Sequence, residues 1–129
     1  MLADAKVTAF LATTRAKRAA AFYGEILQLP QLSEDEYAIV FDLNGVELRL
    51  QKVKEFTPQP FTALGWQVRT IRTTVAALAA RGVVFERFPG LVQDAQGIWA
   101  APSGAQVAWF RDPDGNLLSV AEYPLTIDR

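Results

Sequence analysis

The chain has 129 residues with 13 basic and 14 acidic side chains, a balance that gives no electrostatic reason to expect nucleic acid or a membrane as a partner. Its length fits one domain with a sizeable core. The absence of cysteine and histidine excludes disulfides, thiolate nucleophiles, zinc–thiolate sites and histidine bases. Half of the residues are hydrophobic, and no apolar run is long enough for a membrane span or a secretory signal, so we expect a folded cytoplasmic protein.

The first half of the sequence predicts a strand, a helix and three further strands. A β-branched and aromatic stretch predicts a strand at 7–13. The helical spacing of Phe22, Tyr23 and Ile26 predicts a helix over 15–26 with one face on a sheet. Strands follow at about 30–33, at 37–42 and at 46–52, and the last two are joined by a hairpin turn at Asn44-Gly45.

The second half repeats this order after a connector that contains two prolines. A strand is predicted at 64–68, followed by a helix over 71–81 that begins after Thr70 and ends before Gly82. The remaining strands are predicted at 83–88, 106–111 and 117–123.

The turns of the two halves are similar. Asp42-Leu43-Asn44-Gly45 and Asp112-Pro113-Asp114-Gly115 lie 70 residues apart, and each precedes a strand. A duplicated unit is the simplest explanation, because neither copy buries its sheet alone. The sequence therefore predicts an α+β fold made of two tandem βαβββ modules, with eight strands in all.

Two longer motifs suggest a family. Arg18-Ala19-Ala20-Ala21-Phe22-Tyr23 in the first helix and Trp109-Phe110-Arg111-Asp112-Pro113-Asp114-Gly115-Asn116-Leu117-Leu118 near the end resemble the vicinal oxygen chelate superfamily. This superfamily includes glyoxalases, bleomycin resistance proteins and extradiol dioxygenases. The stretch from Phe88-Pro89-Gly90-Leu91 to Gly97-Ile98-Trp99 is similar to bacterial members of generally unassigned function.

The resemblance implies a curved, half-open eight-stranded sheet around a cavity. It covers nearly the whole chain, so we expect a single domain over 1–129, with module one at about 5–54 and module two at about 61–124. It also favours a homodimer, because a second copy can cover the open sheet edges symmetrically.

The enzymes of this superfamily hold a divalent metal with side chains on four strands. Their register places these four positions at Thr8, Arg49, Ala63 and Ser119. Alanine has no ligand atom, hydroxyls are weak neutral ligands, and a guanidinium repels a cation. We therefore expect no metal and no other cofactor here.

A cavity without a metal would still be lined by side chains that alternate along the strands. These side chains are mostly apolar and aromatic with a few polar groups, which is typical of a small-molecule pocket. Trp109 and Phe10 offer flat surfaces for stacking, and Arg49 offers a partner for an acidic or carbonyl group. The same aromatic side chains could instead fill a core. The predicted ligand-binding residues are Thr8, Phe10, Tyr37, Ile39, Arg49, Gln51, Ala63, Gln67, Val107, Trp109 and Ser119.

Three functions are compatible with these residues. The favoured one is a metal-independent binding protein that sequesters a small apolar or aromatic compound bearing an acidic or carbonyl group, as the antibiotic resistance proteins of this family do. The alternative is a lyase, isomerase or dioxygenase-like enzyme with an unconventional site, in which Arg49 polarises a carbonyl and Glu47 or Tyr37 moves a proton. A third is an interaction module with a filled core. No side chain is singled out as a poised base, so we lean away from an enzyme and leave the catalytic residues unassigned.

Overall fold

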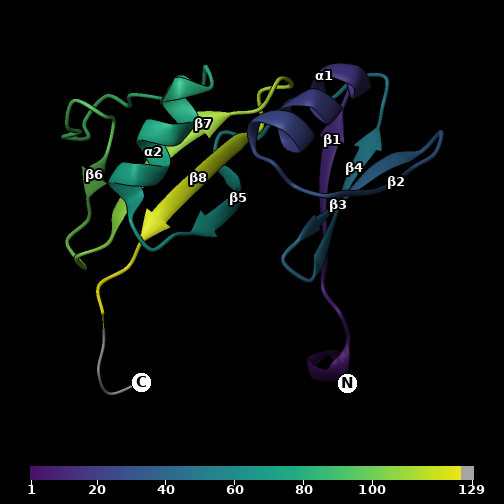
Figure 1. Ribbon diagram of the computed structural model, residues 1–129, viewed down its shortest axis with the longest axis horizontal. Helices are drawn as coiled ribbons and strands as arrows, with labels where there is room; N and C mark the ends of the chain where they lie inside the picture. The colour runs from purple at the N-terminus through teal and green to yellow at the C-terminus, as the bar shows by residue number, and fades with distance from the viewer. Residues whose placement is uncertain (126–129) are drawn as a thin grey trace. The chain divides into compact units, whose positions relative to one another are not determined.

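The computed structural model describes residues 1–125. The chain divides into two compact units, which are described separately. The first contains Met1–Pro58 and Asp112–Gly115, and the second contains Gln59–Arg111 and the chain from Asn116 onward. Each unit has one four-stranded sheet (Figure 1). Among the described residues, no helix has the length and hydrophobicity that crossing a bilayer requires.

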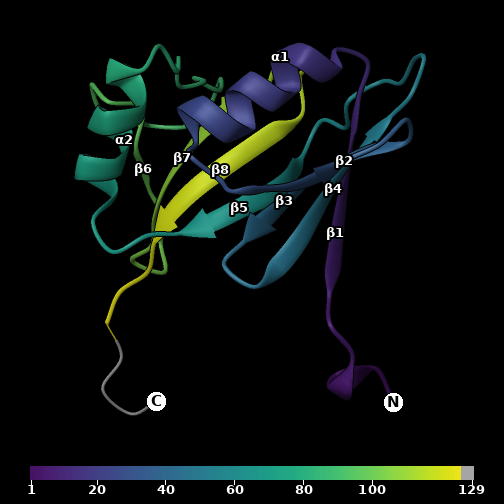
Figure 2. The ribbon, with the colours of Figure 1, turned by 45° about the vertical axis from the view of Figure 1, so that its right-hand side comes forward.

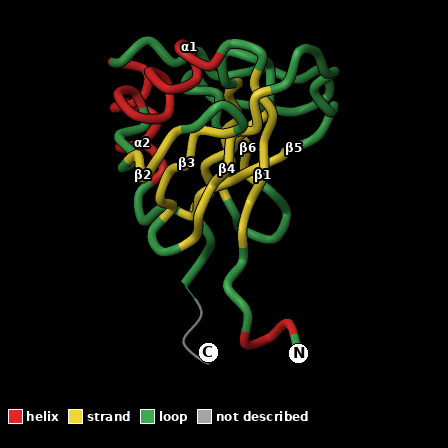
Figure 3. Tube along the Cα trace, turned by 90° about the vertical axis from the view of Figure 1, so that its right-hand side faces the viewer, coloured by secondary structure: helices red, strands yellow, loops and turns green. Residues whose placement is uncertain are grey.

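The first sheet has the strand order β1-β4-β3-β2, with β1 parallel to β4 and the other pairs antiparallel. Figure 3 shows these strands side by side, and Figure 2 shows β1 next to β4. A short 3-10 helix, Leu2–Asp4, precedes the sheet, and α1 continues directly into a π-helical segment. The elements are β1 (Thr8–Thr13), α1 (Ala16–Ala21), the π-helical segment (Phe22–Ile26), β2 (Gln31–Glu34), β3 (Ala38–Leu43) and β4 (Val46–Lys52).

The second sheet repeats this topology with the order β5-β8-β7-β6, and β5 is parallel to β8. Helix α2 contacts β8 and β7 (Figure 1). The elements are β5 (Thr62–Gln67), α2 (Ile71–Ala80), β6 (Trp99–Ala100), β7 (Gln106–Arg111) and β8 (Leu117–Glu122). The prediction of an α+β fold with two tandem βαβββ modules is confirmed.

One strand prediction was wrong. Residues 83–88 form no strand, and the fourth strand of the second sheet is β6, which pairs with β7. The Gln93 side chain explains the change, because its amide nitrogen donates to the carbonyls of Glu86 and Gly97 and its oxygen accepts the N–H of Phe88. These bonds satisfy backbone groups that a strand would otherwise pair with a neighbour.

The largest fully buried side chains of the first sheet lie on one of its faces. Ile39 pairs with Leu50, Phe41 pairs with Leu48, and all four side chains are fully buried. The Tyr23 ring lies 5.9 Å from the Phe41 ring, so the predicted apolar face of the first helix does pack on this sheet.

The two motifs that suggested the family contact each other inside the first unit. The Tyr23 hydroxyl donates to Asp112 Oδ2 over 2.7 Å. Asp114 accepts hydrogen bonds from the backbone N–H and hydroxyl of Thr14, both over 2.8 Å, and from the Thr13 hydroxyl. Burial, reinforced by the negative charge of Asp112, raises the pKa of Tyr23 far above its ordinary value. The tyrosine therefore stays a neutral donor to a buried carboxylate.

The core of the second unit lies on the face of its sheet that carries Leu118 and Val120. Both are buried, and Trp66 stacks on Phe110 at 6.5 Å on the same face, as its parity predicted. Glu122 also lies on this face and accepts the N–H of Ile71 at the start of α2 over 2.9 Å. A carboxylate at this position satisfies a free helix donor and favours the helix dipole.

Candidate functional site

The sheet face opposite the core in the first unit carries Phe10, Arg49 and Val40 in one row across β1, β4 and β3. Phe10 is 54% exposed, whereas Val40 is buried. In the adjacent row Glu47 lies beside Thr8, and its Oε1 is 3.9 Å from Arg49 Nη1. This long ion pair at a half-exposed position leaves the guanidinium free to meet an anionic or carbonyl group.

Two residues predicted on this face lie on the other one. Ile39 pairs with Leu50 in the core and has no exposed surface, so it cannot contact a ligand on the Arg49 face. Tyr37 precedes β3 in the same register, and its carbonyl accepts the N–H of Lys52. The prediction assumed that odd-numbered residues of the two hairpin strands share a face. Because Leu43 pairs with Val46, odd-numbered residues of β3 instead share a face with even-numbered residues of β4.

The remaining predictions for this sheet agree with the register. Thr8, Phe10, Arg49 and Gln51 share one face, and Gln51 is exposed opposite Ala38. Whether they bind a ligand stays a prediction.

In the second unit, Trp109 is the centre of an aromatic group on the face opposite the core. The Phe88 ring meets Trp109 edge-on at 5.4 Å, and the Trp99 ring lies 6.0 Å away, tilted by 35°. The indole N–H of Trp109 donates to Thr62 Oγ1 over 3.1 Å. Three contacts thus fix the orientation of an indole that remains partly exposed.

Thr62 was missed by the sequence reasoning, and the reason is a bulge. Thr62 pairs with Leu117 and Leu64 pairs with Leu118, so two residues of β5 span one residue of β8 at Ala63. The extra residue brings Thr62 to the Trp109 face. Ala63 is exposed but is not an in-register neighbour of Ser119, a position that Gly65 occupies. No signal in the sequence marked this bulge.

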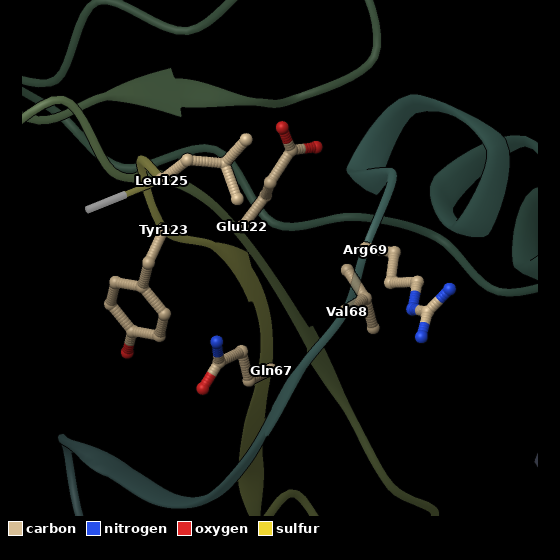
Figure 4. Close-up of a pocket in the computed structure, with 6 residues that line it drawn as sticks. All are labelled: Gln67, Val68, Arg69, Glu122, Tyr123 and Leu125. Carbon is tan, nitrogen blue, oxygen red and sulfur yellow. The ribbon is translucent and has the colours of Figure 1, made fainter. Parts of the chain in front are cut away.

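Gln67 on β5 and Val107 on β7 are both in-register neighbours of Ala121 on β8. Ala121 lies two residues from Ser119 and therefore on the same face, so Gln67 and Val107 share the face of Trp109 and Ser119, as predicted. Gln67 also lines a hollow at the end of the sheet, together with Val68, Arg69, Glu122, Tyr123 and Leu125. In Figure 4 the side chains of Gln67 and Tyr123 project to one side, and the Arg69 guanidinium points away from them.

The residues at the four expected metal positions do not fit a metal. Thr8 and Ser119 offer neutral hydroxyls, Ala63 offers no ligand atom, and Arg49 carries a positive charge. In the part of the chain that the structure describes, no three carboxylate side chains gather in a way that could hold an ion. We therefore derive no chemistry through a metal.

Comparison with solved structures identifies the fold. A lactoylglutathione lyase from Agrobacterium tumefaciens is 16% identical, with a TM-score of 0.71 over 92% of this chain and 93% of that chain. A member of the glyoxalase/bleomycin resistance protein/dioxygenase superfamily from Sphaerobacter thermophilus is 20% identical, with a TM-score of 0.73 over 95% and 99%. A glyoxalase/bleomycin resistance protein/dioxygenase from Nocardioides is 18% identical, with a TM-score of 0.70 over 91% and 82%.

No protein-family model matches the sequence, and no curated protein matches it. At these identities the structural likeness establishes the fold. The chain has the vicinal oxygen chelate fold, as its motifs predicted.

Proposed function

We propose that this protein binds a small, largely aromatic molecule bearing an acidic or carbonyl group, and that it does so without a metal ion. The proposal rests on the indole of Trp109. Its contacts with Thr62, Phe88 and Trp99 fix its orientation, and it remains partly exposed. A fixed aromatic surface provides stacking area at little cost in conformational entropy.

The first sheet, taken by itself, offers a surface that suits an acidic or carbonyl group. Arg49 lies next to Phe10, and its carboxylate neighbour Glu47 is 3.9 Å away. A guanidinium beside an exposed ring offers paired donors and an apolar surface to an aromatic acid.

Titration with 2-naphthoate, followed by NMR on protein labelled with 15N, tests the proposal. Wild type should bind with and without a chelator, and Trp109→Leu should bind about two- to tenfold more weakly because it loses an aromatic contact worth about 0.5–1.5 kcal/mol. Phe61→Leu, which removes a 60% exposed ring, is the control and should bind as wild type does. Binding that requires Mn²⁺, Ni²⁺ or Mg²⁺, or that is unaffected by Trp109→Leu, would contradict it.

The enzyme alternative rests on the same first-sheet face. Arg49 and Glu47 are close enough to polarise a carbonyl and to move a proton, whereas Tyr37 lies on the other face. Product formation from an aromatic ketone or aldehyde in metal-free buffer, lost in Glu47→Gln, would favour the enzyme over the binding protein.

We also propose a homodimer. The outer strands of each sheet, β1 and β2 in the first unit and β5 and β6 in the second, have one neighbour each among the described strands. Such edges favour pairing with a second copy. Light scattering at tens of micromolar should give the mass of two chains, and the mass of one chain would refute the dimer.

A further inference from the structure

Gly65, Ser119 and Trp109 lie in one row across β5, β8 and β7 of the second sheet. Ser119 is the in-register neighbour of both, so the three residues share a face. A side chain at Gly65 would place its Cβ 2.6 Å from Ser119 Oγ. The serine hydroxyl therefore leans over Gly65 and occupies part of the space that the glycine leaves open.

Ser119 differs from the other buried polar residues of the described chain. Thr13, Asp112 and Asn116 each have a partner for their polar groups, whereas the Ser119 hydroxyl has none among the described residues. The residue is 9% exposed. No fully buried side-chain oxygen or nitrogen in the described part lacks a partner, so Ser119 Oγ itself must keep some accessible surface.

A hydroxyl that is mostly withdrawn from water and unpaired costs free energy. A glycine inside a strand often marks a position at which a ligand or another backbone approaches closely. Gly65 lies beside this hydroxyl. Gly65 is exposed and has an ordinary strand conformation, so no backbone strain explains its identity. Together these features describe an exposed backbone position at Gly65 with an unpaired hydroxyl donor beside it.

The side chains around Gly65 and Ser119 limit what a ligand can contact there. The Trp109 N–H is already bonded to Thr62, so the indole offers a ligand its π surface and no polar hydrogen. Gln67, two residues along β5 from Gly65, is exposed, and its amide has no partner in the described chain. Ser119 is thus the polar group that lies closest to the tryptophan in this row.

We infer that the Ser119 hydroxyl donates a hydrogen bond to the carbonyl oxygen of a planar aromatic ligand whose ring lies against Trp109. This inference rests on the proposed function and names the ligand class of its second-sheet face: an aryl ketone, aldehyde or carboxylate. A carbonyl oxygen is a small acceptor that can approach Ser119 Oγ beside the exposed backbone of Gly65, and conjugation keeps it in the plane of the ring that stacks on the indole.

Acetophenone and α-methylstyrene test the inference, because the two molecules have nearly the same shape and differ in an oxygen replaced by a CH₂ group. Their affinities are measured by NMR from the shifts of the Trp109 indole and Ser119 amide resonances. Wild type should bind acetophenone about three- to tenfold more tightly, the worth of one hydrogen bond. Ser119→Ala should remove this preference and leave the affinity for α-methylstyrene unchanged.

Two further measurements exclude a purely structural role for Ser119. The melting temperature of Ser119→Ala should equal or exceed that of wild type, because the lost hydroxyl has no partner in the fold. Gly65→Ala should weaken both probes, since its methyl group would cover the exposed backbone and displace the Ser119 hydroxyl, which lies 2.6 Å from the new Cβ position. If wild type bound the two probes equally, or if Ser119→Ala still preferred acetophenone, the inference would be overturned but the proposed function would not. If neither probe binds wild type at all, both fail.

Discussion

The two modules share a topology and differ in the side chains on the sheet face opposite the core. The first has four strands, with one irregularity in the pairing of β2 with β3, and the face opposite its core combines Phe10 with the charges of Glu47 and Arg49. In the second, a loop fixed by Gln93 replaces the expected strand, and aromatic rings gather around Trp109. The comparison shows that the buried face of each sheet carries the repeated fold, while the side chains on the opposite face differ between the modules.

The largest expected effect comes from a buried hydrogen bond inside the first unit, between a residue of the first module's helix and a residue of the second module's turn. Tyr23→Phe removes the donor to Asp112 Oδ2, and Asp112 is 6% exposed. We expect a loss of about 1–3 kcal/mol in the free energy of unfolding, because a buried carboxylate loses a partner. Urea denaturation measures this loss. Tyr37→Phe, at a 71% exposed position, is the control and should change little.

The same tyrosine gives a pH signature. Its raised pKa means that the folded state holds the proton more tightly than the unfolded state, so this contribution is present below about pH 10 and is lost as the pH rises above it. Wild type should lose stability at alkaline pH more steeply than Tyr23→Phe. Parallel pH profiles for the two proteins would argue against the buried bond.

The next effect concerns the loop that distinguishes the second module. Gln93→Glu keeps the oxygen that accepts the Phe88 N–H but loses the two donors to the carbonyls of Glu86 and Gly97. We expect a loss of about 1–2 kcal/mol and a changed tryptophan fluorescence, because Phe88 and Trp99 flank the loop. Gln31→Glu in the exposed strand β2 should show neither change. Identical effects of the two substitutions would mean that the loop does not hold the aromatic rings.

A smaller effect tests the charge on the first module's face. Arg49→Ala should weaken the binding of benzoate about two- to fivefold, the size expected for a half-exposed ion pair, and should affect neutral benzamide less. Calorimetric titration of both ligands gives the comparison, with Lys54→Ala as the control. Equal losses for the two ligands would remove Arg49 from acid recognition.

The smallest expected effect is a change in thermal stability at acid pH, caused by Asp94 in the second module. The backbone N–H of Ile98, helped by that of Gln96 and by Arg72, holds the pKa of Asp94 below its usual range. A lowered pKa stabilises the fold above about pH 3.9 and ceases to do so as the pH falls. The small difference in melting temperature between wild type and Asp94→Asn should therefore shrink below pH 4. A difference that stays the same at every pH would argue against these bonds to Asp94.

Several features could be predicted from the sequence because they depend on local patterns. Helical spacing placed Phe22 and Tyr23 on a buried face, and alternation placed Trp66 and Trp109 on opposite faces of their sheet. The repeated turns predicted the two modules, and the family motifs predicted the fold. Each of these follows from the period of a single element or from the order of the elements.

The features that were missed depend on how strands meet. Within a strand the sequence determines which residues share a face, but the hairpin register put Ile39 in the core, and a bulge brought Thr62 to Trp109. The loop that replaces the strand predicted at 83–88 depends on three hydrogen bonds of the Gln93 side chain, two donated and one accepted. Only the tertiary structure decided these points, because a shift of one residue between strands exchanges their faces and leaves every local pattern unchanged.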